Sequence, residues 1–167
     1  MSGIFSDSEI ELIDAAKIVL SDGVRRLMGR TALFPTVRGR SARADCRQAR
    51  TALTDKLVAD YGALRYEMAA AVMIDAQGRL IAIEEFPRGD SAMVRICPRI
   101  LAGWIVTHGA VAVLLAHNHP SGDNTPSDQD VTSTDHFRQW LKFMRVDLLD
   151  HIVLSGEGAS SIGGDWL

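Results

Sequence analysis

The feature that most constrains this chain is a short apolar run, Val111 to Ala116, followed at once by two histidines one residue apart, His117 and His119. An apolar and partly β-branched run of this length predicts a buried strand. A loop with proline and glycine comes next, and a helix is then predicted from Ser127 to about Met144. The chain should therefore form a strand, a loop and a helix that present both histidines where a buried strand ends.

The rest of the chain alternates between helical and strand patterns. Further helices are predicted over residues 6–28, 44–61 and 98–109, and further strands over residues 68–74, 79–86, 91–96 and 148–154. Only four residues, 75–78, separate the first two of these strands, which indicates a hairpin. Since a hairpin cannot belong to an all-parallel sheet, the expected fold class is α/β, with a mixed sheet between helices on both faces.

The length of 167 residues favours one main domain with a small N-terminal extension. Residues 1–43 are predicted to form an N-terminal helix and an arginine-rich linker, and residues 44–167 the domain. In the glycine- and serine-rich tail, the terminal Trp166-Leu167 is expected to dock back on the domain. No apolar run reaches about 18 residues and the N-terminus lacks a signal-peptide pattern, so we expect no membrane span and a cytoplasmic protein.

The charge is unevenly distributed, although the net charge of −3 offers no overall case for nucleic-acid binding. Arg25 to Arg50 holds eight arginines and one acidic residue, Asp45. Such a segment could contact the phosphates of a nucleic acid, and a solvated arginine-rich surface or linker is the alternative. The two cysteines, Cys46 and Cys97, form no CxxC pair, which argues against a disulfide framework and against a cysteine zinc site.

His117 and His119 should point to the same side, because side chains alternate along an extended backbone. Asp130, in the first turn of the following helix, could join them as a third ligand. Three protein ligands with one open position are typical of hydrolytic zinc, which lowers the pKa of its bound water to near 7. Two imidazoles and a carboxylate suit Zn²⁺ best, although iron, nickel or cobalt also fit. Ser127 and Asp130 have a second interpretation, since Ser-x-x-Asp is also a capping box that needs no metal.

Hydrolysis also needs a general base near the water. The candidates by position are Glu67, Glu84, Glu85 and Asp123, and the residue pattern alone does not select among them. Ser127 could both cap the helix and lend its hydroxyl to a developing oxyanion.

The string HNHPSGDxxPSxxD, residues 117–130, resembles the RadC-like branch of the JAB1/MPN/Mov34 (JAMM) metalloprotease family. The wider JAMM signature is a distant glutamate, then His-x-His, and then Ser-x-x-Asp. The chain is also similar to the branch at Cys97-Pro98-Arg99 and at residues 149–153, and the resemblance covers about residues 41–167. It departs from the branch at Ile100, where the family has a glutamate, in the tail, and in residues 1–40, which lack a helix-hairpin-helix-like region.

The resemblance implies the three-layer α/β/α arrangement seen in cytidine deaminases. A deaminase itself is disfavoured, because its H-x-E and PCxxC elements are missing. The roles implied by the family are general base for Glu67, oxyanion support for Ser127, and Zn²⁺ ligation for His117, His119 and Asp130.

The other histidines have plainer interpretations. His108 is expected at a helix end, as a cap or surface residue, and His136 is expected to face solvent. His151 lies in the family-like pattern LDHIV. We expect it to pack in the interior, with a role beside a metal ligand as the alternative.

Three functional hypotheses follow. The leading one is a zinc-dependent hydrolase of peptide or isopeptide bonds. The second is a protein of DNA repair or mobile elements, which binds nucleic acid through Arg25 to Arg50, or a partner, with little protease activity. The third is an inactive metal-bound interaction module, against which the intact Glu67 and Ser127 argue. The N-terminal helix could also serve as a homodimer contact.

Overall fold

The elements described by this computed structural model alternate between helices and strands, as the sequence pattern predicts. The model describes residues 40–87, 96–163, 166 and 167, with side chains from Cys46 onward. In chain order the elements are α3 (Arg40–Leu57), a π-helical turn η1 (Val58–Gly62), β1 (Ala69–Ile74), β2 (Leu80–Glu85), α4 (Pro98–His108), β3 (Ala112–Asn118), α5 (Asp128–Phe143), β4 (Asp147–Ser155) and β5 (Gly158–Ser161). The predicted helix over residues 6–28 and most of the predicted strand over 91–96 lie outside the described residues.

The five strands form one mixed sheet in the order β2-β1-β3-β4-β5. β1 pairs antiparallel with both β2 and β3, and β4 pairs antiparallel with β5. β3 and β4 are parallel, and α5 makes the crossover between them. The predicted hairpin and the mixed sheet are therefore confirmed.

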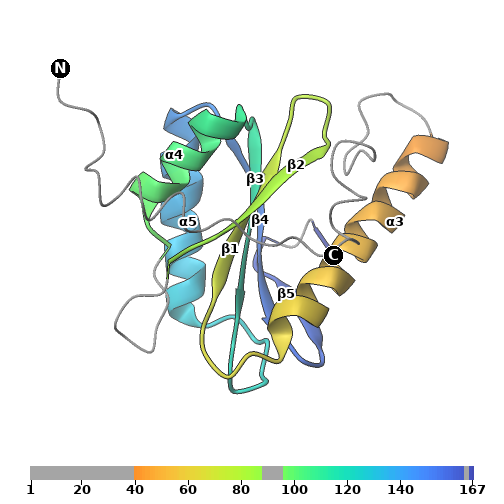
Figure 1. The fold of residues 1–167 in the computed structure, drawn as a ribbon, viewed down its shortest axis with the longest axis vertical. Coiled ribbons are helices and arrows are strands. Elements are labelled where there is room, and N and C mark those ends of the chain that lie inside the picture. Colours follow the sequence, from red (N-terminus) through yellow and green to blue (C-terminus); the bar gives the residue numbers. More distant parts are fainter. Residues whose placement is uncertain (1–39, 88–95, 164–165) are drawn as a thin grey trace.

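Helices cover both faces of the sheet (Figure 1). α3 packs on one face, in a core that includes Leu53, Val72 and Leu114. α4 and α5 pack on the other face, in a core that includes Trp104, Leu141 and Leu115. Because Leu114 and Leu115 are neighbours on β3, the two cores follow from side chains that alternate along one fully buried strand. The α/β/α fold class is confirmed.

The predictions were wrong at the start of the first described helix and in the tail. The first described helix begins at Arg40, whereas the sequence pattern placed residues 40–43 in the linker and the helix start at Ala44. Four residues of glycine, alanine and serine, Gly158–Ser161, form the edge strand β5 in the predicted tail. Their sequence lacks an alternating pattern because β5 is held mainly through backbone pairing with β4.

The C-terminus docks on the domain through Trp166, as predicted. Trp166 is 2% exposed, and its indole N–H donates to Thr54 Oγ1 on α3 at 2.9 Å. The buried carboxylate of Asp150 accepts hydrogen bonds from the backbone N–H groups of Gly163 and Trp166. The expectation was wrong for Leu167, which is 59% exposed.

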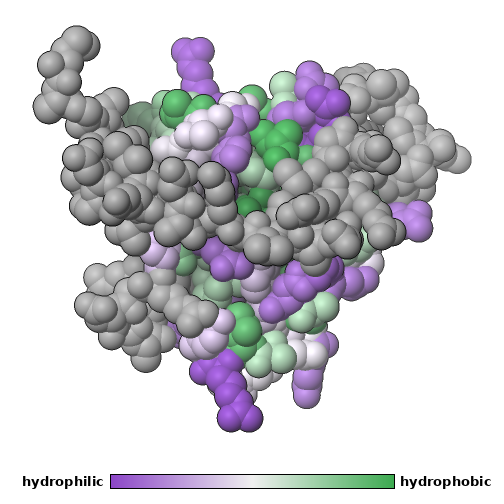
Figure 2. Space-filling model, in the orientation of Figure 1, coloured by the Kyte–Doolittle hydropathy of each residue, from purple (hydrophilic) through white to green (hydrophobic). Residues whose placement is uncertain are grey.

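On the face shown in Figure 2, hydrophilic side chains project at the outer edges of the described part and hydrophobic ones lie between them. Among the described helices, none combines the length and apolar character that crossing a bilayer requires. From the arginine-rich segment, only Arg47 and Arg50 have described side chains, and the Arg50 guanidinium lies 5.9 Å from the ring centroid of Trp166. Arg50 therefore contributes to docking of the tail.

Candidate metal centre

The two motif histidines lie at the carboxyl end of β3, where the crossover through α5 begins. His117 is 7% exposed and belongs to the strand, and the His119 backbone N–H donates to the carbonyl of Leu154 at 3.0 Å. A turn then closes between the Gly122 N–H and the His119 carbonyl at 3.1 Å. Pro120 suits the second position of such a turn, and Gly122 adopts a φ of 86° that favours glycine. The predicted strand-loop-helix unit is confirmed.

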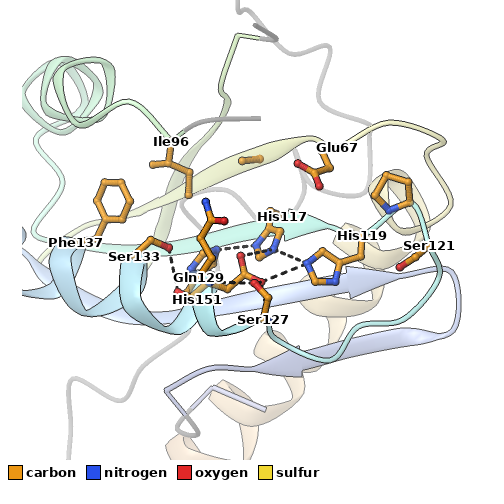
Figure 3. A pocket seen from close by; sticks show the side chains of 13 residues that line it. Glu67, Ile96, His117, His119, Ser121, Ser127, Gln129, Ser133, Phe137 and His151 are labelled. Carbon is orange, nitrogen blue, oxygen red and sulfur yellow. Dashed lines mark hydrogen bonds and ion pairs between the residues drawn. The ribbon is translucent and has the colours of Figure 1, made fainter. Parts of the chain in front are cut away.

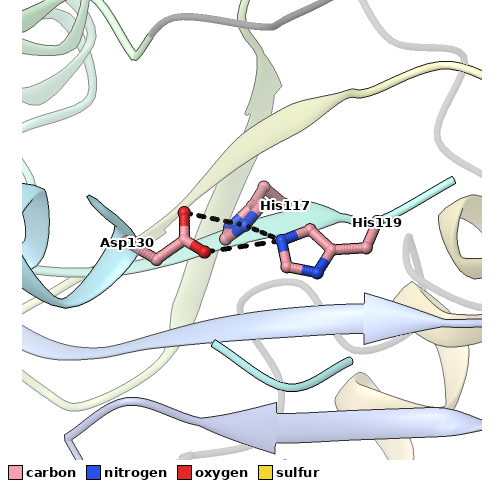
Figure 4. A group of neighbouring side chains, drawn as sticks. All are labelled: His117, His119 and Asp130. Atoms are coloured by element: carbon pink, nitrogen blue, oxygen red, sulfur yellow. Dashed lines mark hydrogen bonds and ion pairs between the residues drawn. The ribbon is translucent and has the colours of Figure 1, made fainter. Parts of the chain in front are cut away.

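His117, His119 and Asp130 converge on one point (Figure 4). The two Nε2 atoms lie 3.1 Å apart, His117 Nε2 lies 3.3 Å from Asp130 Oδ1, and His119 Nε2 lies 3.4 Å from Asp130 Oδ2. With bonds of about 2.0–2.1 Å to a tetrahedral metal, ligand atoms lie about 3.3–3.4 Å apart. The three observed separations are close to this value, although they involve both oxygens of Asp130. With one ligand atom from each residue, all three atoms lie within 4.8 Å of one another, and the group could hold one metal ion.

Asp130 is held by the capping box at the start of α5. The Ser127 N–H and hydroxyl both donate to Asp130 Oδ2, at 2.9 and 2.6 Å, and the Asp130 N–H donates to Ser127 Oγ at 3.1 Å. Burial disfavours the Asp130 carboxylate, but the bonds from Ser127 and the nearby histidines outweigh it and lower the pKa of Asp130. The capping box and the ligand position are therefore compatible, and Ser127 orients an ionised carboxylate.

The atoms that face one another in this group are hydrogen-bond acceptors. His119 Nδ1 lies 2.8 Å from the carbonyl oxygen of Asp123, which can only accept, so Nδ1 carries a proton, and in the neutral ring the lone pair lies on Nε2. Burial lowers the pKa of His117 to about 4, so this ring is neutral near pH 7. Lone pairs and a carboxylate at such short separations repel one another without a cation between them. This donor set suits a transition-metal ion such as Zn²⁺.

Asn118, between the two histidines, serves the opposite side of β3. Its amide oxygen accepts from the Met68 N–H at 2.7 Å, and its amide nitrogen donates to the carbonyls of Leu64 and Tyr66 at 3.2 and 3.0 Å. These bonds fasten the segment that carries Glu67 to the strand that carries the ligands. The same alignment of the two segments continues into the sheet, where Ala69 of β1 pairs with His117 of β3.

Glu67 lies beside the ligands in a pocket of about 880 Å³ (Figure 3). It shares the face of Ala69, two residues on, which pairs with His117. The pocket is lined on its polar side also by Ser127, Gln129 and Ser133, and by the apolar side chains of Ile96 and Phe137. Glu67 is therefore placed where a base could reach a water at the metal.

The other three candidates for the base have different surroundings. Glu84 Oε1 lies 2.6 Å from His108 Nε2, at the end of α4. Glu85 hydrogen-bonds Tyr61, and Asp123 Oδ1 accepts from the Thr125 N–H. None of the three lines the pocket. Of the four candidates for the base, Glu67 alone lines the pocket that His117, His119 and Asp130 also line.

Two further residues, His151 and Thr134, connect to the Nδ1 atom of His117 through hydrogen bonds. His151 Nε2 lies 2.8 Å from His117 Nδ1, and His151 Nδ1 lies 2.6 Å from Thr134 Oγ1. The sequence pattern favoured packing for His151 and did not single out Thr134. The family-like pattern LDHIV had left a role beside a metal ligand open for His151, whereas nothing local points to Thr134, because β4 and α5 bring the two residues together only in the folded sheet. His136, by contrast, is exposed as predicted.

Comparison with known proteins matches a region of the chain that includes these residues. The family model described as the RadC-like JAB domain matches residues 47–165. The chain belongs to the RadC-like JAB domain family. It is 38% identical over 96 residues to a UPF0758 protein of Thiobacillus denitrificans, covering 58% of this chain and 43% of that protein. It is 40% identical over 100 residues to one from a Janthinobacterium species, covering 60% and 45%.

A third UPF0758 protein, from Chromobacterium violaceum, is 36% identical over 107 residues, which cover 64% of this chain and 48% of that protein. The chain therefore spans less than half the length of these relatives. Their names state no activity, so the chemistry of this JAB domain has to be argued from its site.

Proposed function

We propose that this RadC-like JAB domain is a zinc-dependent hydrolase of peptide or isopeptide bonds. The observation that carries the proposal is the convergence of three lone-pair donors, from His117, His119 and Asp130, in a pocket that also presents Glu67. The choice of an amide bond rests on the resemblance to JAMM metalloproteases. The apolar walls at Ile96 and Phe137 suit an apolar side chain of a peptide substrate.

If these three residues hold Zn²⁺, the ion would act as a Lewis acid and would lower the pKa of a water molecule to near 7. Glu67 takes a proton from the water that attacks the carbonyl carbon. It returns the proton to the departing nitrogen as the carbon–nitrogen bond breaks, and the products are an amine and a carboxylic acid, which releases the second proton of the water to the solvent. Ser127 holds Asp130, and its hydroxyl can support the carbonyl oxygen only when it turns away from Oδ2.

The metal and the base can be tested separately. Purified, unstripped protein should carry about one Zn²⁺ per chain by elemental analysis, and His119→Ala should lose it. Glu67→Gln should keep the metal and cleave at least about 100-fold more slowly, because the amide cannot accept the proton. Cleavage would be measured on peptides from a denatured proteome, with new N-termini read by mass spectrometry.

Glu157→Gln, at an exposed turn position between β4 and β5, is the matched control and should cleave like the wild type. Unstripped protein without stoichiometric metal would contradict the zinc assignment. Undiminished cleavage by Glu67→Gln would contradict the role of Glu67 as base.

A further inference from the structure

A buried chain of hydrogen bonds connects two of the proposed ligands behind the metal centre. It runs from His117 Nδ1 to His151 Nε2 at 2.8 Å, and from His151 Nδ1 to Thr134 Oγ1 at 2.6 Å. Thr134 Oγ1 then lies 2.6 Å from the backbone carbonyl oxygen of Asp130. His151 is 2% exposed and Thr134 is fully buried, so water does not compete for these contacts. In Figure 3 a dashed line joins His151 to His117.

The direction of every bond in this chain follows from its last acceptor. A backbone carbonyl can only accept, so the single hydroxyl proton of Thr134 points to the Asp130 oxygen. Thr134 Oγ1 must then accept from His151 Nδ1–H. A neutral His151 keeps its lone pair on Nε2, which accepts from His117 Nδ1–H. The remaining lone pair of His117 therefore lies on Nε2, which faces His119 and Asp130.

The opposite direction is disfavoured on contact distance. If Thr134 gave its proton to His151, its oxygen would face the Asp130 carbonyl oxygen at 2.6 Å with no hydrogen between them. The neutral rings of His117 and His151 therefore each carry their proton on Nδ1.

We propose that His151 is a positioning residue, which with Thr134 holds His117 in the one tautomer and ring orientation that can bind a metal. This inference rests on the proposed function. It also ties the two ligands together, because Asp130 offers its carboxylate to the metal centre while its carbonyl orients the chain to His117. His119 is set separately, by the carbonyl of Asp123, so loss of His151 should weaken metal binding without abolishing it.

The tautomer can be read without any metal. In metal-stripped wild type, ¹⁵N NMR of the imidazole nitrogens should place the His117 proton on Nδ1. Thr134→Val keeps the shape of the side chain and removes the hydroxyl, so the His117 and His151 tautomers should become mixed. Thr132→Val is the matched control, since Thr132 makes the same kind of bond, to the Asp128 carbonyl at 2.8 Å, on the exposed side of α5. It should leave the spectrum of His117 unchanged.

Zinc affinity is the second measurement, by competition with a chromophoric chelator. His151→Leu should bind Zn²⁺ about 10- to 100-fold more weakly than wild type. His151→Gln should recover much of the loss, because its amide can accept from His117 and donate to Thr134. Urea unfolding would establish that each variant is folded.

The outcomes separate this inference from the proposed function. A wild-type His117 protonated on Nε2, or zinc affinity unchanged in both His151→Leu and Thr134→Val, would overturn the positioning role. Wild type that shows the expected tautomer but binds no Zn²⁺ would instead overturn the proposed function, because the hydrogen-bond chain would then serve no metal.

Discussion

At the scale of single residues, Asn118 lies between His117 and His119 in the sequence, and its side chain fixes the distant backbone segment that carries Glu67. It is fully buried, and its amide satisfies one backbone donor and two backbone acceptors on the segment that leads to Glu67. An Asn in a His-x-His motif reads in the sequence as a spacer, because nothing local shows which backbone groups lie opposite. The convergence of His117, His119 and Asp130 could be predicted from spacing, but the contacts of Asn118 join segments that are distant in the sequence.

Asn118→Ala should lower the free energy of unfolding by about 2–4 kcal/mol, because it leaves buried backbone groups without partners. It should also slow cleavage more than it reduces zinc content, since it loosens the segment of Glu67 and leaves the three ligands in place. Urea unfolding, elemental analysis and the peptide assay would measure these effects. Asn124→Ala, in the half-buried loop before α5, is the matched control and should cost much less. Equal stabilities of the two variants would show that the Asn118 bonds contribute little.

At the scale of elements, hydrophobic patterning was sufficient for the buried strands and for the edge strand β2, and insufficient for the edge strand β5. β1 and β3 are apolar throughout, apart from the motif residues that end β3, so their positions followed from composition within two residues. Gly62 is the last residue of η1, but its closest contact is with another element. A Cβ at Gly62 would lie 2.2 Å from the Ser155 carbonyl oxygen, so this position allows η1 to approach β4. In the sequence, only a glycine marks such an approach, and glycine is equally common in turns and at helix ends.

The docking of the C-terminal segment on α3 gives a prediction at this scale. Thr54→Val should lower the free energy of unfolding by about 1–3 kcal/mol, because it leaves the buried indole N–H of Trp166 without its acceptor. Thr51→Val makes the same change at an exposed position of α3, one turn earlier, and should be nearly neutral. The two midpoints of urea unfolding would be compared directly. If both variants unfold at the same urea concentration, the Thr54 bond does not hold the tail.

At the scale of the whole molecule, the fold places a hydrophobic layer on each face of the sheet and brings several buried polar groups, among them His117, Asn118 and Ser155, to the carboxyl ends of β3 and β4. β3 ends with the motif, and α5 starts at Asp128, directly after its cap residue Ser127. The ligands therefore share their rigid support with the core. This arrangement also buries two histidine rings, and it makes the stability of the metal-stripped protein depend on pH.

Burial lowers the pKa of His117 to about 4 and that of His151 to about 3, from 6.5. As pH falls below 6.5, the unfolded chain binds protons that the folded chain excludes. The free energy of unfolding of metal-stripped protein should therefore fall between pH 6.5 and pH 4, by up to about 1.4 kcal/mol per pH unit for each ring. Urea unfolding at pH 7.5 and 5.0 would measure the slope, which His151→Gln should reduce. The slope should persist in His136→Gln, whose ring is exposed, and a midpoint independent of pH would mean that the folded protein protonates both buried rings.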